Sequence, residues 1–362
     1  MIRSEAKLQT LLNRIEPLNE AAMAAAQARL DRLTKPPGSL GQLEAYAVRL
    51  AGIAGEVHAT FPKKAVVVMA ADHGVVAEGV SAFPPEVTPQ MVRNFLSGGA
   101  AINALARLAG ADVVCIDVGV AADIDHPALV RRKVRCGTAN FTMGPAMTRA
   151  EALEALCVGI GVAEELADRG YRLLATGEMG IGNTTSAAAI LAAFTGDDPA
   201  RCVGRGTGVD DAALARKAEV VRRALAVNRP DPQDPVDVLH KVGGLEIAAL
   251  AGLMLGAATR RVPVVVDGFP ASSAALVACR LAPRVKDYLF PSHQSAEQGH
   301  RRLLEVLGFA PPLHLDMRLG EGTGAVLTFH LLEAACRIRD EMATFEAAGV
   351  SGPVAKEEAA RS

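Results

Sequence analysis

Short apolar runs that end in glycine or an acidic residue alternate with helical patterns along most of the chain. Each run is nearly continuous in apolar residues, which is typical of parallel strands covered on both faces. The runs are AVVVMAADHG (65–74), DVVCIDVGV (112–120), YRLLATGEMG (171–180), VPVVVDGF (262–269) and PLHLDMRLGEG (312–322). The helical patterns between or after them span 149–169, 183–195, 211–227, 242–260 and 323–340. This alternation predicts an α/β fold with a mostly parallel sheet, flanked by helices and joined by right-handed crossovers.

Polar side chains gather at the ends of these runs. In an open α/β sheet, ligands bind beyond the carboxyl ends of the strands. The residues at those positions are Asp72, His73, Asp117, Glu178, Asp267, Asp316 and Glu321. The chemistry is therefore expected at that edge.

The first sixty residues differ, because they have helical patterns and no strand pattern before Lys63. We expect a small helical domain over 1–62 that includes part of the C-terminal helix, about 325–348. The large α/β domain is expected over 63–324, and a flexible tail over 349–362. In TKPPGSLGQLE (34–44), Ser39 followed by Gln42 predicts a capping box that opens a helix.

Composition narrows the class of partner. The 362 residues carry a net charge of −2, without a strongly basic segment, which argues against nucleic acid or an anionic membrane as the main partner. The longest apolar run, IAALAGLMLGAA (247–258), is shorter than the roughly 20 residues that a membrane span needs. The start of the chain is polar, and no C-x-x-C pair occurs among the six cysteines. We expect a cytoplasmic protein with reduced cysteines.

The stretch GEMGIGNTTSAAA (177–189) resembles a phosphate loop but fits neither common template. Against the P-loop pattern G-x-x-x-x-G-K-[ST], Asn183 stands in place of the lysine, and against G-x-G-x-x-G, Thr185 replaces the third glycine. A strand, several glycines and a helix start still direct backbone N–H groups toward an anion. Without the lysine, a monophosphate is more plausible than a triphosphate. The alternative is that Asn183 is only the helix N-cap and the glycines serve packing.

Two further glycine-rich loops carry charged residues. In VGRGTGVDDAALARK (203–217), Asp210 is expected to cap a helix, and Lys217 lies two turns into it. Lys217 could supply the missing cation, although spacing alone favours a solvated helical lysine. In LGEGTGAV (319–326), Glu321 lies between two glycines, which lets a ligand approach the backbone and lets the carboxylate point into a cleft. The alternative is a turn glutamate in solvent.

Histidines near strand ends raise the question of a metal. Asp72 and His73 in ADHGV, with His293 and His300 in PSHQSAEQGH, show no H-E-x-x-H or comparable spacing. Orientation of loops by hydrogen bonding is the favoured interpretation. Ser295 with Gln298 is a second candidate capping box. A Ser–His–Asp hydrolase lacks its G-x-S-x-G elbow.

Seven ordered motifs together resemble one family, the nicotinate-nucleotide–dimethylbenzimidazole phosphoribosyltransferases. They are TKPPGSLGQLE, ADHGV, GEMGIGNTTSAAA, GTGVDDAALARK, DGFPASSAAL, SHQSAEQGH and LDMRLGEGTGA, and the resemblance covers about residues 30–345. It implies transfer of phosphoribose from nicotinate mononucleotide to dimethylbenzimidazole, giving α-ribazole 5′-phosphate and nicotinate in cobalamin assembly. It also implies a homodimer with a Rossmann-like large domain and a small helical domain, with no metal and no cofactor.

The resemblance also implies roles for individual residues. Glu321 would be the catalytic base and Glu178 the second carboxylate, near the ribose. The residues expected around the phosphate are Gly180, Gly182, Asn183, Gly206, Gly208 and Lys217. Ser81 and Gln90, in GVSAFPPEVTPQM, would lie by the benzimidazole, and Ser295 near the nicotinate or ribose.

Two other functions remain open on the sequence. A kinase or nucleotidyltransferase could use 177–184 as a degenerate P-loop, which Asn183 disfavours. A nucleotide sensor could bind a mononucleotide without turnover, which the glycine setting of Glu321 disfavours weakly.

Overall fold

The computed structural model describes residues 5–206, 208 and 210–352. The chain divides into two compact units: residues up to Pro17 together with Phe61–His330, and Leu18–Thr60 together with residues from Leu331 onward. Residues 353–362 of the tail expected over 349–362 lie outside the described part of the chain.

Within the described residues, the larger unit contains a parallel six-stranded sheet in the order β3-β2-β1-β4-β5-β6. The strands are β1 (Lys64–Ala71), β2 (Ala111–Gly119), β3 (Val130–Arg131), β4 (Leu173–Met179), β5 (Val264–Val266) and β6 (Leu289–Pro291). This is the strand order of the doubly wound Rossmann fold, whose switch point lies between β1 and β4. The predicted α/β class is confirmed.

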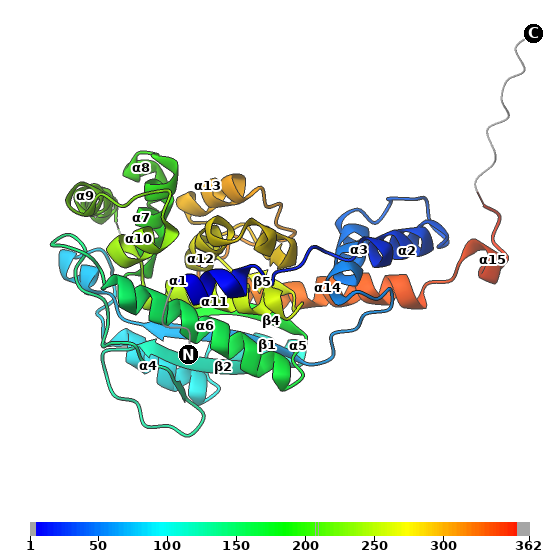
Figure 1. Cartoon of the computed structure of the whole chain (residues 1–362), viewed down its shortest axis with the longest axis horizontal. Helices are drawn as coiled ribbons and strands as arrows, with labels where there is room; N and C mark the ends of the chain where they lie inside the picture. The colour runs from blue at the N-terminus through cyan, green and yellow to red at the C-terminus, as the bar shows by residue number, and fades with distance from the viewer. Residues whose placement is uncertain (1–4, 207, 209, 353–362) are drawn as a thin grey trace, which may run out of the picture. The chain divides into compact units, whose positions relative to one another are not determined.

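The helices are α1 (Glu5–Leu12), α2 (Glu20–Asp31), α3 (Gln42–Ala54), α4 (Val87–Leu96), α5 (Ala101–Ala109), α6 (Arg149–Asp168), α7 (Asn183–Thr195), α8 (Pro199–Cys202), α9 (Asp211–Asn228), α10 (Pro235–Val242), α11 (Leu245–Thr259), α12 (Phe269–Leu281), α13 (Gln298–Leu307), α14 (Thr323–Glu341) and α15 (Phe345–Ala348). Two 3₁₀ turns are η1 (Gly74–Glu78) and η2 (Pro283–Tyr288). Helices α11 and α12 cover one face of the sheet, and α4 and α5 cover the other (Figure 1). The pattern expected over 242–260 is split, because α10 ends at Val242 and α11 begins at Leu245.

Helix α11 is the core helix of the larger unit, and it packs closely against α6. A Cβ on Gly159 would lie 1.8 Å from the carbonyl oxygen of Ala249, and one on Gly252 would lie 1.9 Å from that of Leu156. Only glycine permits this approach of the two backbones. Among the described residues, no helix has the length and apolar character required to cross a bilayer. The six cysteines all lie within the described residues, and none forms a disulfide there.

The strand expected over 312–322 is wrong. Leu313 makes only an isolated parallel bridge with His293, and no strand forms in this segment. The backbone at Asp316 and Glu321 has φ of 52° and 62°, which is incompatible with a continuous extended strand. Strand β6 occupies the sheet edge instead, and its three residues were too short to predict a strand.

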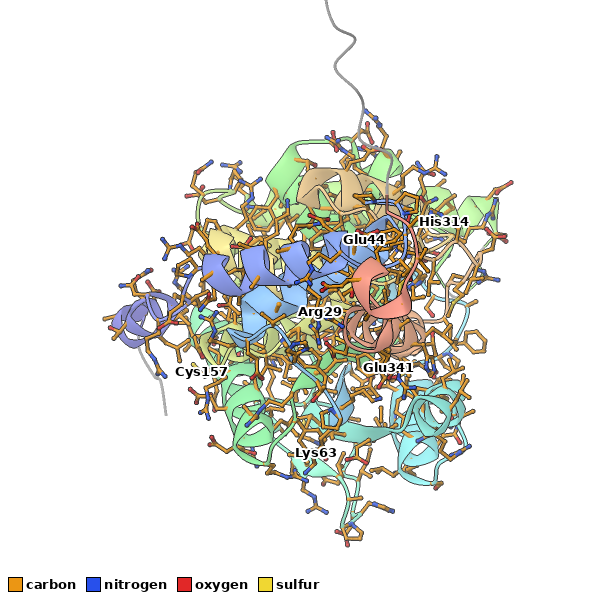
Figure 2. The ribbon with its side chains drawn as sticks, turned by 90° about the vertical axis from the view of Figure 1, so that its right-hand side faces the viewer. Arg29, Glu44, Lys63, Cys157, His314 and Glu341 are labelled. Atoms are coloured by element: carbon orange, nitrogen blue, oxygen red, sulfur yellow. The ribbon has the colours of Figure 1, made fainter. Side chains whose placement is uncertain are left out.

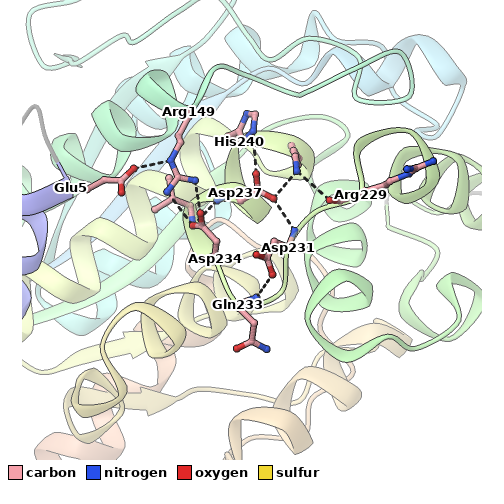
Figure 3. A network of polar contacts seen from close by, with 10 residues as sticks. Glu5, Arg149, Arg229, Asp231, Gln233, Asp234, Asp237 and His240 are labelled. Atoms are coloured by element: carbon pink, nitrogen blue, oxygen red, sulfur yellow. Dashed lines mark hydrogen bonds and ion pairs between the residues drawn. The ribbon is translucent and has the colours of Figure 1, made fainter.

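Helix α1 groups with the larger unit, whereas the sequence suggested that it belongs to the helical domain. Its Leu8 and Leu11 are buried. Arg149 at the start of α6 donates to Glu5 of α1 at 2.7 Å and to Asp234 at 2.7 Å (Figure 3). Asp234 in turn caps α10 by accepting from the N–H groups of its first turn. The burial of these leucines, together with the Glu5–Arg149 ion pair, joins α1 to the larger unit.

The smaller unit contains α2, α3, α15 and the C-terminal part of α14. Figure 2 labels Arg29 of α2, whose Nε donates to the carbonyl oxygen of Arg339 at 2.6 Å, and Glu44 of α3. Glu44 forms a buried ion pair with Lys35 at 2.8 Å and accepts from the N–H groups of Gly38 and Leu40.

The capping box expected at the start of α3, Ser39 with Gln42, is therefore wrong. The N-cap of α3 is Gly41, and no side chain caps it. The Glu44 carboxylate satisfies the free N–H groups of the preceding turn instead.

Candidate active site

A cavity of about 370 Å³ lies at the carboxyl ends of the strands, by the switch point between β1 and β4. Its walls come from the loops after β4, β5 and β6, from α4 and the segment before it, and from the segment before α14. The lining residues are Val80, Ser81, Phe83, Val87, Met91, Glu178, Met179, Gly180, Ile181, Gly182, Asn183, Thr184, Gly206, Gly268, Phe269, Pro270, His293, Ser295, Glu297, Arg318, Leu319, Gly320 and Glu321. Most of the residues to which the family resemblance gives a role thus meet in one cavity.

The loop after β4 places Glu178 at the cavity floor. Glu178 is the penultimate residue of β4, and its side chain is buried. The alternative in which Asn183 is only the N-cap of the helix is wrong, because Gly182, with φ of 97°, occupies the N-cap and Asn183 begins α7. The Asn183 amide instead donates a hydrogen bond to Glu178 Oε2. A residue that reads as a helix cap in sequence therefore orients the carboxylate.

Glu321 enters the cavity from a strained loop. Gly320, Glu321 and Gly322 all have positive φ, and Glu321 is one of the few residues other than glycine to do so. Such a conformation persists only where the surroundings enforce it, and it concentrates at functional sites. The enforcing group is Asp267 at the end of β5, which accepts from the N–H groups of Gly322 at 3.1 Å and Ala325 at 3.0 Å.

The two glutamates share a region crowded with acids. Burial, together with the nearby carboxylates of Glu246 and Asp267, raises the pKa of Glu178 to about 8. Burial likewise raises the pKa of Glu321 to about 7, against the opposing effect of the Ile102 backbone N–H. Among the described residues, Glu321 Oε2 has no hydrogen-bond partner. Two carboxyl groups that titrate near neutrality in a cavity are a strong indication of a reactive site.

Lys217 lies beneath the second glycine loop rather than in the cavity wall. Its ammonium group is buried and donates to Thr184 Oγ1 at 2.7 Å and to the carbonyl oxygen of Gly204 at 3.3 Å. Burial lowers its pKa to about 8, and the charge of Glu297 opposes this. Thr184 follows Asn183 on α7, so a positive charge reaches the 177–184 loop from α9. The solvated-lysine alternative is wrong.

The second glycine loop itself reaches the cavity at Gly206. Gly206 lines the wall, while Gly208 lies outside the lining, beside the Arg318 guanidinium. Asp210 caps α9 by accepting from the Ala213 N–H at 2.8 Å, as expected.

Ser295 lies in the loop after β6, which internal hydrogen bonds hold in place. Its N–H donates to His300 Nδ1 at 2.9 Å, and the His300 Nε2 therefore carries the proton that bonds Ser272 Oγ at 2.9 Å. Burial lowers the pKa of His300 to about 3, which keeps the ring neutral. The capping box with Gln298 is wrong, because Ser295 Oγ accepts from the N–H of Glu297, which is itself the N-cap of α13.

Of the two residues expected beside the benzimidazole, only one lines the cavity. Ser81 lines the cavity, and its Oγ accepts from the N–H of Phe83 at 3.1 Å. Gln90 is exposed on α4 and does not line the cavity, whereas Val87 and Met91, one turn apart on that helix, do. The face of α4 toward the cavity is therefore apolar, and Gln90 lies beside that face rather than on it.

The histidines near the strand ends make hydrogen bonds within the protein. His73 Nε2 lies 2.6 Å from Glu246 Oε1, and its Nδ1 lies 3.1 Å from Ser186 Oγ, with all three side chains buried. His293 Nδ1 lies 2.9 Å from Ser292 Oγ. No group of three or more His, Cys, Asp or Glu side chains arranged to hold a metal occurs among the residues that the structure describes.

Glu297 and Arg318 are cavity residues that the sequence did not single out. Glu297 is buried, and Arg318 donates to the carbonyl oxygen of Gly206 at 3.3 Å. Both lie within motifs that carry the family resemblance, SHQSAEQGH and LDMRLGEGTGA. In the sequence, Glu297 could have been recognised as the single acidic residue in the loop SHQSAEQGH.

The fold and the cavity define a class: a Rossmann-type α/β protein in which glycine loops and buried carboxyl groups face one ligand-sized space. A family model described as "Phosphoribosyltransferase" matches residues 15–350, and the chain belongs to this family.

Named relatives are similar over nearly the whole chain. The nicotinate-nucleotide–dimethylbenzimidazole phosphoribosyltransferase of Chloroflexus aggregans is 58% identical, with 95% of this chain and 98% of that protein aligned. The enzyme of the same name from Geobacter sulfurreducens is also 58% identical, with the same shares aligned. A crystal structure of the enzyme of this name from Thermus thermophilus is 52% identical, covers 93% of this chain and 100% of its own, and has a TM-score of 0.88.

Proposed function

We propose that the protein transfers 5-phosphoribose from nicotinate mononucleotide to 5,6-dimethylbenzimidazole, yielding α-ribazole 5′-phosphate and nicotinate. The observation that carries this proposal is the meeting of Glu321, Glu178 and two glycine loops in one cavity. The names of the relatives support it. The reaction would serve assembly of the nucleotide loop of cobalamin.

Glu321 is the base in this proposal. When a benzimidazole nitrogen attacks the anomeric carbon, the ring becomes cationic and its other N–H becomes acidic. A pKa of about 7 lets Glu321 be ionised at neutral pH and still accept that proton. Its Oε2, which has no partner among the described residues, is the oxygen available for the N–H. The leaving nicotinate departs as a neutral ring nitrogen, so the reaction needs no general acid.

Glu178 stabilises positive charge on the donor. The sugar passes through an oxocarbenium-like state, as in glycoside chemistry. A carboxylate held by Asn183 beside that sugar is pre-organised to stabilise the developing charge. With a pKa of about 8, Glu178 is mostly protonated in the empty cavity, and the positive charge of a bound pyridinium favours its ionised form. Attack on the face opposite the departing β-linked nicotinate gives inversion at the anomeric carbon.

The phosphate is a handle and does not react. Gly180, Gly182 and Asn183 lie at the start of α7, whose N-terminal end favours an anion, and Gly206 and Gly208 form the second loop. The N–H of Asn183 itself donates to the Gly180 carbonyl oxygen at 3.0 Å, so Asn183 contributes through its place at this helix end. Lys217 supplies positive charge through its contact with Thr184. Binding energy from the phosphate holds the anomeric carbon in line with the acceptor.

The acceptor occupies the apolar side of the cavity. Ser81 with Val87 and Met91 forms a surface suited to a planar aromatic ring, whereas the exposed Gln90 is placed less well for this role. Ser295 lies on the nicotinate or ribose side. We also propose that the protein is a cytoplasmic homodimer that needs no metal and no cofactor.

One assay tests the proposal against its rivals. The protein is mixed with nicotinate mononucleotide and dimethylbenzimidazole, without metal, and nicotinate release is followed. Release that depends on the acceptor supports transfer. Release without the acceptor indicates hydrolysis, and no release favours a nucleotide sensor or a kinase that requires Mg²⁺ and a triphosphate.

A further inference from the structure

Glu297 is a buried carboxylate in the cavity wall. It precedes α13, is only 5% exposed, and lines the same space as Glu178 and Glu321. The Glu297 N–H donates a hydrogen bond to Ser295 Oγ. The Ser295 N–H in turn donates to Nδ1 of the neutral His300. The carboxylate is therefore mounted on a rigid support, as a residue that positions a substrate must be.

Only one oxygen of this carboxylate is used within the protein. Glu297 Oε1 accepts from the Gly206 N–H at 2.8 Å. Glu297 Oε2 is buried and has no hydrogen-bond partner among the described residues. It lies against Gly204, where a Cβ would come within 2.1 Å of it. A buried carboxylate oxygen without a donor is costly, and such groups in native proteins call for an explanation.

The missing partner must be a hydrogen-bond donor. On nicotinate mononucleotide, the phosphate dianion and the nicotinate carboxylate are acceptors only, so the ribose hydroxyls are its sole donors. The dimethylbenzimidazole N–H is a donor too, but the base Glu321 is assigned to it. Gly206, which Glu297 holds, is one of the glycines proposed to surround the phosphate, and the ribose is the group joined directly to that phosphate.

We propose that Glu297 accepts a hydrogen bond from a ribose hydroxyl of the donor and so selects ribose over deoxyribose; this rests on the proposed function. The hydroxyl satisfies Oε2, which a deoxyribose leaves unpaired. A site built to bond a substrate hydroxyl rejects the analogue that lacks it because the buried partner then has no donor. Glu297 is thus a specificity-determining residue, in addition to its bond to the glycine loop.

The test compares kcat/KM for nicotinate mononucleotide and its 2′-deoxy and 3′-deoxy analogues in the wild type and in Glu297→Gln. Gln can still accept from the Gly206 N–H, but it presents an amide N–H₂ where Oε2 was. In the wild type, one deoxy analogue should be poorer by about 10- to 100-fold, the range for a hydrogen bond to a charged group. In Glu297→Gln the amide N–H₂ can still donate to the hydroxyl, but this bond is neutral, so the preference should fall about tenfold, to a few-fold.

The ratio of kcat/KM between the three mononucleotides distinguishes substrate selection by Glu297 from a purely structural role. If Glu297→Gln lowers kcat/KM equally for all three donors, Glu297 only holds Gly206 and the proposal is wrong. Glu305→Gln, which removes the same charge from the exposed side of α13, should leave the preference unchanged. Should Glu297→Gln fail to fold, a wild type that does not discriminate against either analogue overturns the proposal by itself.

Failure of the proposed function is distinguishable from failure of this inference. If the wild type releases no nicotinate with the acceptor present, the transfer reaction is wrong. The Glu297 proposal is then still decided by calorimetric affinities for the three mononucleotides, since the hydroxyl bond forms on binding. Equal affinities for all three would contradict it.

Discussion

The raised pKa of Glu178 predicts how the stability of the protein depends on pH. The carboxyl is fully buried, and its pKa rises from 4.5 to about 8 on folding. Between these values the folded protein holds one proton more at this site than the unfolded chain. The free energy of unfolding should therefore fall by about 1.4 kcal/mol per pH unit across this window, from this site alone. The contribution is fully present below pH 4.5 and is lost as the pH rises through 8.

Glu178→Gln removes this dependence. The Gln carbonyl can still accept the hydrogen bond from Asn183, so the side-chain packing is kept. Between pH 4.5 and 8, the change in the free energy of unfolding that Glu178 causes approaches roughly 5 kcal/mol. This is an upper limit, because neighbouring acids share the proton. The variant should thus gain stability relative to the wild type with each pH unit.

Urea unfolding followed at several pH values between about 5 and 8.5 measures the difference directly. The difference in free energy of unfolding between variant and wild type should rise with pH. Its slope should be about 1.4 kcal/mol per pH unit, which corresponds to one proton. A difference that stays constant over this range would refute the reasoning, because it would mean that Glu178 has the same pKa in the folded and unfolded states. Glu305→Gln, at an exposed glutamate on α13, is the matched control, and the slope of Glu178→Gln is read relative to it.

Three further outcomes concern the proposed reaction. Glu321→Gln should cut turnover by about 10²- to 10⁴-fold while nicotinate mononucleotide still binds; unchanged turnover would remove Glu321 from the base role. Lys217→Ala should weaken the affinity for the mononucleotide by at least about tenfold, measured by calorimetry, because it removes a buried cation beside Thr184; an unchanged affinity would show that the phosphate lies elsewhere. Binding of the cationic mononucleotide at about pH 7 should release a fraction of a proton from Glu178, which calorimetry in buffers of different ionisation enthalpy detects as a buffer-dependent heat. A heat independent of buffer would contradict this linkage.

The sequence placed candidate residues at one edge of the sheet correctly, because the ends of parallel strands are predictable. Apolar runs that end at Glu178 and Asp267 are parallel strands, and parallel strands end at one edge of the sheet. Glycines on both sides of Glu321 marked a special backbone, and the structure has positive φ at all three residues. In these cases a local pattern was enough, since the chain needed no distant residue to fix its conformation.

Predictions from the local sequence were wrong where contacts with other residues determine the conformation. Ser39 with Gln42 has the spacing of a capping box, but the carboxylate of Glu44, paired with Lys35, takes the free N–H groups. Asn183 is of a residue type favoured at helix N-caps, but its side chain bonds Glu178 instead. The segment around Leu313 is apolar, yet no strand forms there. Each outcome depends on a contact that propensity does not encode.

The charges of the site fit the charge balance of the proposed reaction. The donor enters with a cationic ring, and the ring leaves neutral while the acceptor becomes cationic and then loses a proton. Positive charge thus moves across the cavity from the donor side to the acceptor side. Glu178 and Glu321 face this space with pKa values of about 8 and 7, so each can ionise when a cation is near and neither needs to stay ionised in the empty cavity. A lysine in the 177–184 loop would oppose that movement, which gives a physical reason for the absence of the P-loop lysine and for the burial of Lys217 behind Thr184.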